Sequence, residues 1–164
     1  MHAMTVVALA MMAFGGTEPA QALSAQPEKG IDIGTVLAFQ KLGAEYGGII
    51  PNKFGYVSFV SGFEAAGQGL PGFLLPSREK LNLRVDPIIY GRIPKLPQVD
   101  VPFGLDLYET AVADEGLREL AGQKKLIWLS LTQTRVTDGG MKHLKDLQAF
   151  VSAAHRYQGH RRRA

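Results

Sequence analysis

The chain has 164 residues, a length that suits one domain. Its apolar content of 46% and charged content of 20% are ordinary for a globular protein and argue against wholesale disorder. The net charge of +3 is concentrated in residues 155–164, which hold four Arg and no acid. Without them, 14 basic side chains (18 minus 4) stand against 15 acidic ones. The chain has no Cys, which excludes disulfides and thiolate metal sites but does not decide the compartment.

The first residues carry the features of an export signal. Thr5–Phe14 is an apolar run of ten residues, too short to cross a bilayer as a helix. Ala20-Gln21-Ala22 follows as an A-x-A cleavage site. We therefore expect residues 1–22 to be a signal peptide and the protein to be exported, to the periplasm or beyond. No Lys or Arg precedes the run, so an N-terminal core helix in a cytoplasmic protein stays open as the alternative.

A linker and a cap region are expected next. Residues 23–34 are polar and contain Pro and Gly, which is typical of a linker. Residues 35–80 are interpreted as an N-terminal cap region. Its first element is a helix over Thr35–Tyr46, capped by Thr35 and ended by Gly47-Gly48.

The rest of the cap region is expected to hold a hairpin and a loop. Ile49-Ile50 and Tyr56–Val60 flank a turn, which predicts strand, turn and strand. Ser61–Ser77 is rich in Gly and Pro but also in apolar residues. This composition predicts a packed loop rather than a disordered one.

Residues 105–122 and 129–146 repeat each other at a spacing of 24 positions. The matching pairs are Leu105 and Leu129, Leu107 and Leu131, Thr110 and Thr134, Val112 and Val136, Asp114 and Asp138, Gly116 and Gly140, and Leu120 and Leu144. A fixed period in the twenties indicates a solenoid, in which each repeat is one strand and one return arm.

The pattern within a unit predicts its local structure. Leu129 and Leu131 point to one side of a short strand, and the residues between and around them point to the other. Thr137-Asp138 is expected to cap a short helix whose inner face holds Met141 and Leu144.

These units closely resemble the leucine-rich repeat in its bacterial 24-residue form, with the core V-T-D-x-G-L-x-x-L. The two matching cores are Val136–Leu144 and, with Ala113 in place of Thr, Val112–Leu120. The resemblance implies an α/β fold: a short right-handed solenoid with parallel strands on one face and short helices on the other. An N-terminal capping helix and an irregular Gly/Pro-rich segment would precede it. The expected repeats are 105–128 and 129–152.

The frame weakens on both sides of these repeats. Upstream, residues 81–104 form a degenerate repeat with several Pro, so its return arm is expected to be extended. Downstream, Ala153 and His155 occupy the slots of Leu129 and Leu131, and residues 153–164 are read as a basic tail. This unfinished end predicts marginal stability or self-association through the C-terminal edge.

The resemblance also implies a binding surface. In leucine-rich repeats the outward residues of the strands line a concave face, and here that set is Trp128, Tyr108, Arg84, Asp106, Ser130 and Thr132. Trp, Tyr and Arg are the residue types that anchor interfaces. The alternative, that Trp128 packs against neighbouring loops, stays open.

The sequence offers no catalytic or metal-binding motif. Gly62–Gly69 lacks the Lys and Ser/Thr of a phosphate-binding loop, and His143, His155 and His160 do not have metal-ligand spacing. In leucine-rich repeats the aspartate at this position accepts backbone N–H groups at the start of the helix. The resemblance therefore implies a structural role for Asp114 and Asp138. We therefore expect no catalytic residue, no metal and no cofactor.

The favoured function is a non-enzymatic interaction module that binds a protein or glycan through the concave sheet. One alternative is a truncated or frame-shifted remnant of a longer repeat protein without independent activity. The last-ranked alternative is binding of anions or nucleic acid through the Arg-rich tail, which otherwise is a solvated end.

Overall fold

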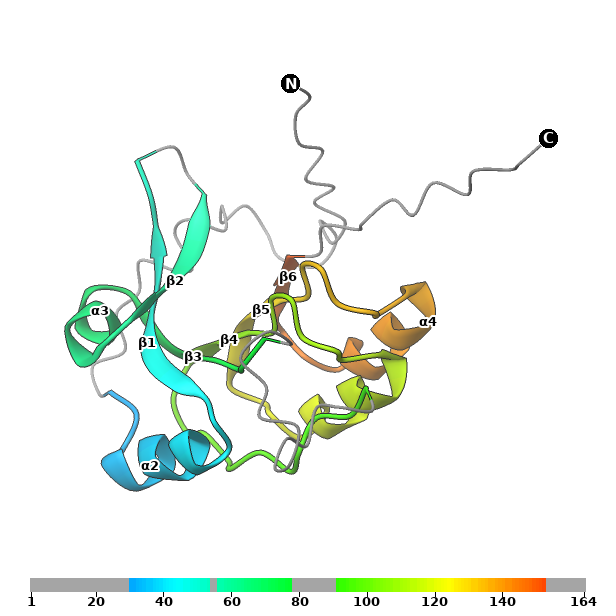
Figure 1. Cartoon of the computed structure of the whole chain (residues 1–164), viewed down its shortest axis with the longest axis horizontal. Helices are drawn as coiled ribbons and strands as arrows, with labels where there is room; N and C mark the ends of the chain where they lie inside the picture. Colours follow the sequence, from blue (N-terminus) through cyan, green and yellow to red (C-terminus); the bar gives the residue numbers. More distant parts are fainter. Residues whose placement is uncertain (1–29, 54–55, 78–90, 153–164) are drawn as a thin grey trace.

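The computed structural model describes residues 30–53, 56–77 and 91–152. Its elements in chain order (Figure 1) are α2 (Ile33–Lys41), β1 (Glu45–Pro51), β2 (Val57–Ser61), α3 (Phe63–Gln68), β3 (Leu70–Leu74), β4 (Phe103–Asp106), the 3-10 helix η2 (Asp114–Leu120), β5 (Leu126–Ser130), α4 (Asp138–Met141), the 3-10 helix η3 (Lys142–Leu144) and β6 (Phe150–Ser152). None of these helices combines the length and apolar character that crossing a membrane requires.

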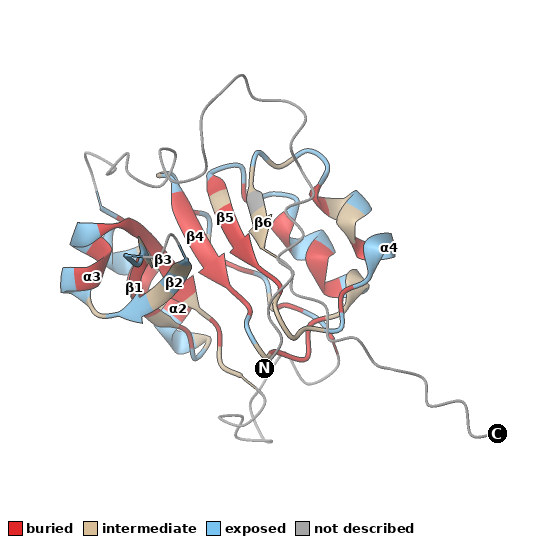
Figure 2. Ribbon diagram, turned by 90° about the horizontal axis from the view of Figure 1, so that it is seen from above, coloured by how far each residue is buried: buried red, intermediate tan, exposed pale blue. Residues whose placement is uncertain are grey.

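The six strands form one mixed sheet in the order β2-β1-β3-β4-β5-β6. The first three strands pair antiparallel, and β3 to β6 pair parallel. The sheet curls into a half-barrel. Figure 2 shows the buried residues concentrated in its central strands.

The predicted solenoid is wrong. A solenoid would place residues 81–83, which precede 105–107 by 24 positions, beside β4, but these residues lie outside the described part of the chain. The strand next to β4 is instead β3, with Gly72 opposite Gly104, 32 positions earlier (104 minus 72). On its other side β3 pairs antiparallel with β1, which no parallel solenoid contains.

Two glycines in β1 explain why this part of the sheet can fold so tightly. A Cβ on Gly47 would lie 2.0 Å from the carbonyl oxygen of Val60, and a Cβ on Gly48 would lie 2.0 Å from that of Ala65. Only glycine allows the hairpin and α3 to approach the strand this closely. The glycine content of the segment therefore serves a compact, non-repetitive packing.

The local structure of the two clear repeats is as predicted. β4 and β5 are adjacent parallel strands with Leu105 opposite Leu129. Leu105 and Leu129 in these strands are buried, and so are Leu107 and Leu131, which directly follow the strand ends. The helical segments begin at Asp114 and Asp138. The 24-residue period thus describes two units correctly, although it does not extend to the whole fold.

The expected register at the downstream end is wrong. β6 pairs with β5 so that Val151 lies opposite Leu129, a step of 22 positions (151 minus 129). The step from β5 to β6 is therefore two residues shorter than the 24-residue period, and Val151 occupies the position that the period assigns to Ala153. Val151 packs against the main core together with Leu147 and Ala149. Leu147, Ala149 and Val151 thus cover the core of the last repeat better than the unfinished end predicted from the sequence would.

The predicted helix over Thr35–Tyr46 is wrong at both ends. Asp32 is the N-cap of α2, and its Oδ1 accepts the N–H of Thr35 at 2.9 Å. The helix ends at Lys41 because Gly43 adopts φ 81, a left-handed conformation that stops the helix. Tyr46 consequently lies in β1, where it is buried.

The hairpin prediction is confirmed, whereas the loop over Ser61–Ser77 is wrong. β1 and β2 pair antiparallel around the turn, but the supposed loop holds α3 and β3. The sequence argued against strand β3 because it contains Pro71, and Pro lacks the N–H that a strand donates to its neighbour. The pairing of β3 with β4 begins only at Gly72, so the missing N–H of Pro71 lies outside that ladder.

The buried apolar residues of the described chain form two clusters. The main core joins α2, the repeats and the segment 91–102, which contains no helix and contributes Ile93, Leu96 and Val99. Phe73 of β3 stacks on Phe39 of α2, with ring centroids 3.8 Å apart. The second cluster consists of Ile49, Leu70 and Trp128, with Val57, Phe59 and Ile127 packed around it.

Candidate functional site

The outward residues of β4 and β5 divide into an apolar row and a polar row. The register sets Gly104 beside Trp128 and, one step further along the strands, Asp106 beside Ser130. Ser152 of β6 continues the polar row beside Ser130. The polar row therefore lies at the carboxyl ends of the parallel strands.

Trp128 belongs to the second apolar cluster rather than to an open surface. The residue is 3% exposed and packs with Ile49 and Leu70. Gly104 makes this possible, because a Cβ there would lie 2.5 Å from Cγ1 of Ile49. Trp128 is thus covered by side chains of the β1–β2 hairpin and by Leu70 of β3. Within the described part of the chain, its Nε1 has no hydrogen-bond partner. A partner protein would have to displace this cluster to contact the indole.

Asp106 and Ser130 form a buried polar pair. Asp106 is 8% exposed and its Oδ1 accepts the N–H of Tyr108 at 2.9 Å. Burial raises the pKa of Asp106 above its usual value, while the N–H of Tyr108 and the hydroxyl of Ser130 act to lower it. The main effect of the pair is to fix the chain as it leaves β4, just before Tyr108.

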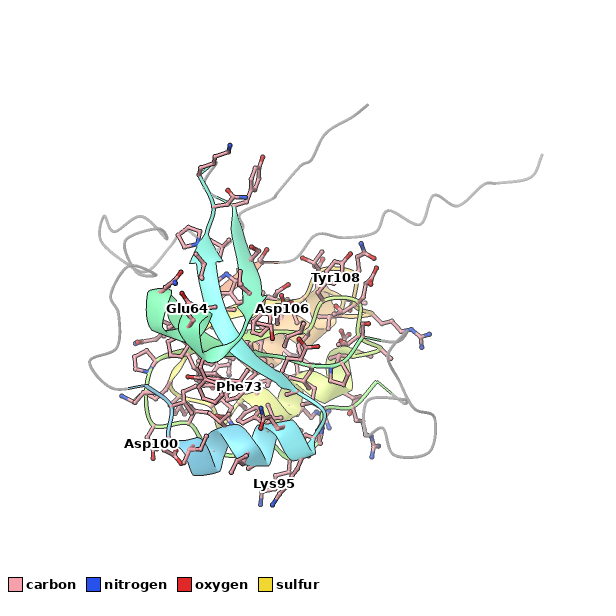
Figure 3. The ribbon with its side chains drawn as sticks, turned by 60° about the vertical axis from the view of Figure 1, so that its left-hand side comes forward. Glu64, Phe73, Lys95, Asp100, Asp106 and Tyr108 are labelled. Carbon is pink, nitrogen blue, oxygen red and sulfur yellow. The ribbon has the colours of Figure 1, made fainter. Side chains whose placement is uncertain are left out.

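Tyr108 is the exposed aromatic residue of this region, at 39% exposed (Figure 3). Its hydroxyl accepts a hydrogen bond from Nε2 of Gln133 at 3.1 Å and donates one to Oε1 of Glu109 at 3.2 Å. A backbone bond of 3.1 Å from the N–H of Glu109 to the carbonyl of Thr132 joins the two loops. We call Tyr108, Glu109, Thr132 and Gln133 the Tyr108 ridge.

The two loops of the ridge share an unusual backbone. Glu109 and Gln133 have φ of 57 and 59, which are the only left-handed values of non-glycine residues in the described chain. Such a conformation costs of order 1–3 kcal/mol and persists only where the surroundings enforce it. Here the hydroxyls of Thr110 and Thr134 donate to the carbonyls of Leu107 and Leu131 at 2.8 and 2.7 Å and close each turn.

Sequence reasoning missed Glu109 and Gln133. The signal was present, because the two residues are 24 positions apart and both are polar. Their left-handed backbone and their shared contact with Tyr108 depend on the way the loops stack, which the period alone does not reveal.

Asp114 has a different role from the one expected. Asp114 does not cap its own helix; its two carboxylate oxygens accept the N–H and the hydroxyl of Thr137 in the next unit, both at 2.7 Å. Thr137 is the N-cap of α4, as predicted. Gly140 is required beside this contact, since a Cβ there would lie 2.6 Å from Oδ1 of Asp114.

The structure thus brings together four of the six predicted binding residues near the Tyr108 ridge: Tyr108, Asp106, Ser130 and Thr132. Trp128 lies on β5, as Ser130 does, but inside an apolar cluster. Arg84 lies outside the described residues. No group of three metal-ligating side chains occurs within the described ranges. No protein-family model, curated protein or solved structure matches this chain.

Proposed function

We propose that the chain is a non-catalytic interaction module and that a protein partner docks on the Tyr108 ridge. The observation that carries this proposal is the exposed Tyr108 ring, whose hydroxyl is held between Gln133 and Glu109. Tyr is among the residue types that dominate interface energies. A ring that is already ordered loses little conformational entropy on binding.

The position of the ridge supports the same conclusion. It follows the carboxyl ends of β4 and β5, the edge at which parallel sheets of α/β proteins generally bind their ligands. The face of the sheet that carries Trp128 is a poorer candidate, because Ile49 and Leu70 already cover this side chain. The strained turns at Glu109 and Gln133 are also typical of functional positions.

A nucleophilic role for Ser130 is disfavoured by its surroundings. The residue is buried, and its partner Asp106 is buried as well. His143, the one imidazole within the described ranges, lies on η3, whereas Ser130 ends strand β5. An attacking hydroxyl needs both a base and access to its substrate.

Site-specific photocrosslinking tests the proposal. p-Benzoylphenylalanine is placed at Tyr108 and, as a control, at Leu37, an exposed apolar position on α2. Proteins crosslinked from position 108 but not from position 37 are then purified and their dissociation constants measured. We expect Tyr108→Ala to weaken binding at least tenfold and Tyr108→Phe to have a smaller effect, with Leu37→Ala unchanged.

Three results would contradict the proposal. Equal crosslinking from the two positions would remove the ridge as an interface. A partner that binds Tyr108→Ala as tightly as the parent chain would do the same. Binding that survives at the ridge variants but disappears on removal of residues 155–164 would favour the Arg-rich tail, with a steep salt dependence.

A further inference from the structure

Among the described residues, the β2 strand forms one edge of the sheet and lacks the protection that such edges usually carry. In the described sheet it pairs only with β1. Its sequence, Val57–Ser61, contains no charged residue and no Pro. Natural edge strands are commonly guarded by Lys, Pro or a bulge, because an open row of N–H and C=O groups recruits other strands.

Apolar side chains gather around this edge. Val60 is 45% exposed, and Tyr56 and Phe63, which flank the strand, are exposed as well. Ser58 and Ser61 are small and exposed, so they do not obstruct an approaching strand. Figure 1 shows the β1–β2 hairpin extending away from the rest of the described chain.

The charges at the two ends of β2 are opposite. Lys53 is exposed at the turn end of the strand, and Glu64 is exposed at its base, where α3 begins. Antiparallel pairing of two β2 strands brings the turn end of each beside the base of the other. Each Lys53 then approaches Glu64 of the second copy, whereas parallel pairing would set like charges together.

We propose that β2 pairs antiparallel with β2 of a second copy of this chain, about a two-fold axis at Phe59. Val57 then lies opposite Ser61 of the second copy, and Ser58 lies opposite its Val60. The two sheets continue into one another, and Val60 of each copy becomes covered. An interface of this kind uses the same surface of both chains, which is the commonest symmetry of protein dimers.

Sedimentation velocity over a concentration series tests this interface with the full chain. We expect a reversible dimer. Val60→Lys should shift it to monomer at every concentration, while Leu37→Lys, at a comparably exposed position on α2, should leave it dimeric. Circular dichroism of both variants verifies that the fold is retained. A monomeric parent chain up to millimolar concentration, or equal behaviour of the two variants, would overturn the proposal.

Charge exchange tests the antiparallel register. Lys53→Glu and Glu64→Lys should each raise the dimer dissociation constant several-fold, and the double variant should restore it. Two single effects that merely add would overturn the register.

Cysteine crosslinking gives an independent reading, because the chain has no Cys of its own. An equal mixture of Ser58→Cys and Val60→Cys chains should form a mixed disulfide on mild oxidation with copper phenanthroline. A mixture of Ser58→Cys and Leu37→Cys chains should not. Equal yields from the two mixtures would place the contact elsewhere.

Discussion

The N-terminal and C-terminal halves of the sheet are built by different means. From β4 to β6, strands recur at nearly constant spacing, and each return arm bonds the next through contacts such as that of Asp114 with Thr137. From β1 to β3, the chain reverses direction and depends on close backbone approaches at Gly47 and Gly48. The repeat in the sequence therefore predicts how its own two strands pair, but not which strands pair beside them in the sheet.

Phe73 connects the two halves, so its removal should have the largest effect. Its ring contacts Phe39, Tyr46 and Phe103, which come from α2, β1 and β4. Phe73→Ala should lower the free energy of unfolding by about 3–5 kcal/mol. Urea unfolding followed by circular dichroism and by the fluorescence of the only Trp measures it. Two separate transitions in the parent chain would show that the halves are not coupled as described.

Leu131→Ala should act on the repeat half. Leu131 is buried in the main core, and its truncation should cost about 2–5 kcal/mol in the same urea experiment. The exposed Leu37 provides the control, because Leu37→Ala should change stability by no more than about 0.5 kcal/mol. Similar losses from both substitutions would mean that Leu131 is not a core residue.

Asp114 should contribute through its contact with the next unit. The backbone N–H and the hydroxyl of Thr137 hold the pKa of Asp114 below its usual value. Asp114→Asn should lower the free energy of unfolding by about 1 kcal/mol at pH 7, a modest figure because Asp114 is only half-buried and water screens its charge. Because the folded pKa is lowered, this contribution is present above the unfolded pKa and is lost as the pH falls through the folded one.

The control for Asp114 is its period equivalent. Asp138→Asn removes an exposed carboxylate that accepts no hydrogen bond from a following unit within the described chain, so its effect should stay near zero. Equal effects of the two substitutions across the pH series would show that the contact with Thr137 adds no stability.

Asp106 should give the smallest effect and the opposite pH dependence. Burial raises the pKa of Asp106, so the folded chain binds this proton more tightly than the unfolded chain does. That stabilisation is complete below the unfolded pKa and is lost as the pH rises through the folded pKa. Asp106→Asn should therefore be at least as stable as the parent chain at pH 7, by at most about 1 kcal/mol, and the gap should close near pH 4. A variant that is less stable at pH 7 would show that the ionised carboxylate stabilises the fold.

The contrast between the halves also explains how far the sequence predicts the fold. The strands that carry Leu105 and Leu129 were predictable, because the 24-residue spacing and the alternating leucines reflect local geometry. The burial of Trp128 was not, because the contact of Ile49 with Gly104 joins segments that no pattern relates. The repeat pattern places Tyr108 among the outward residues of the strand, whereas the residue follows the end of β4, and the turns that fix its hydroxyl depend on the stacking of two loops.

The neighbour of β4 is the most direct test of this division, and NMR measures it through nuclear Overhauser contacts across the strands. The structure predicts contacts from Gly104 to Gly72, and from Gly72 onward to Gly47 with the antiparallel pattern. A repeat array that continued upstream would instead give contacts from β4 to residues 80–83 with the parallel pattern. Finding the latter contacts, and none between Gly72 and Gly104, would contradict the account.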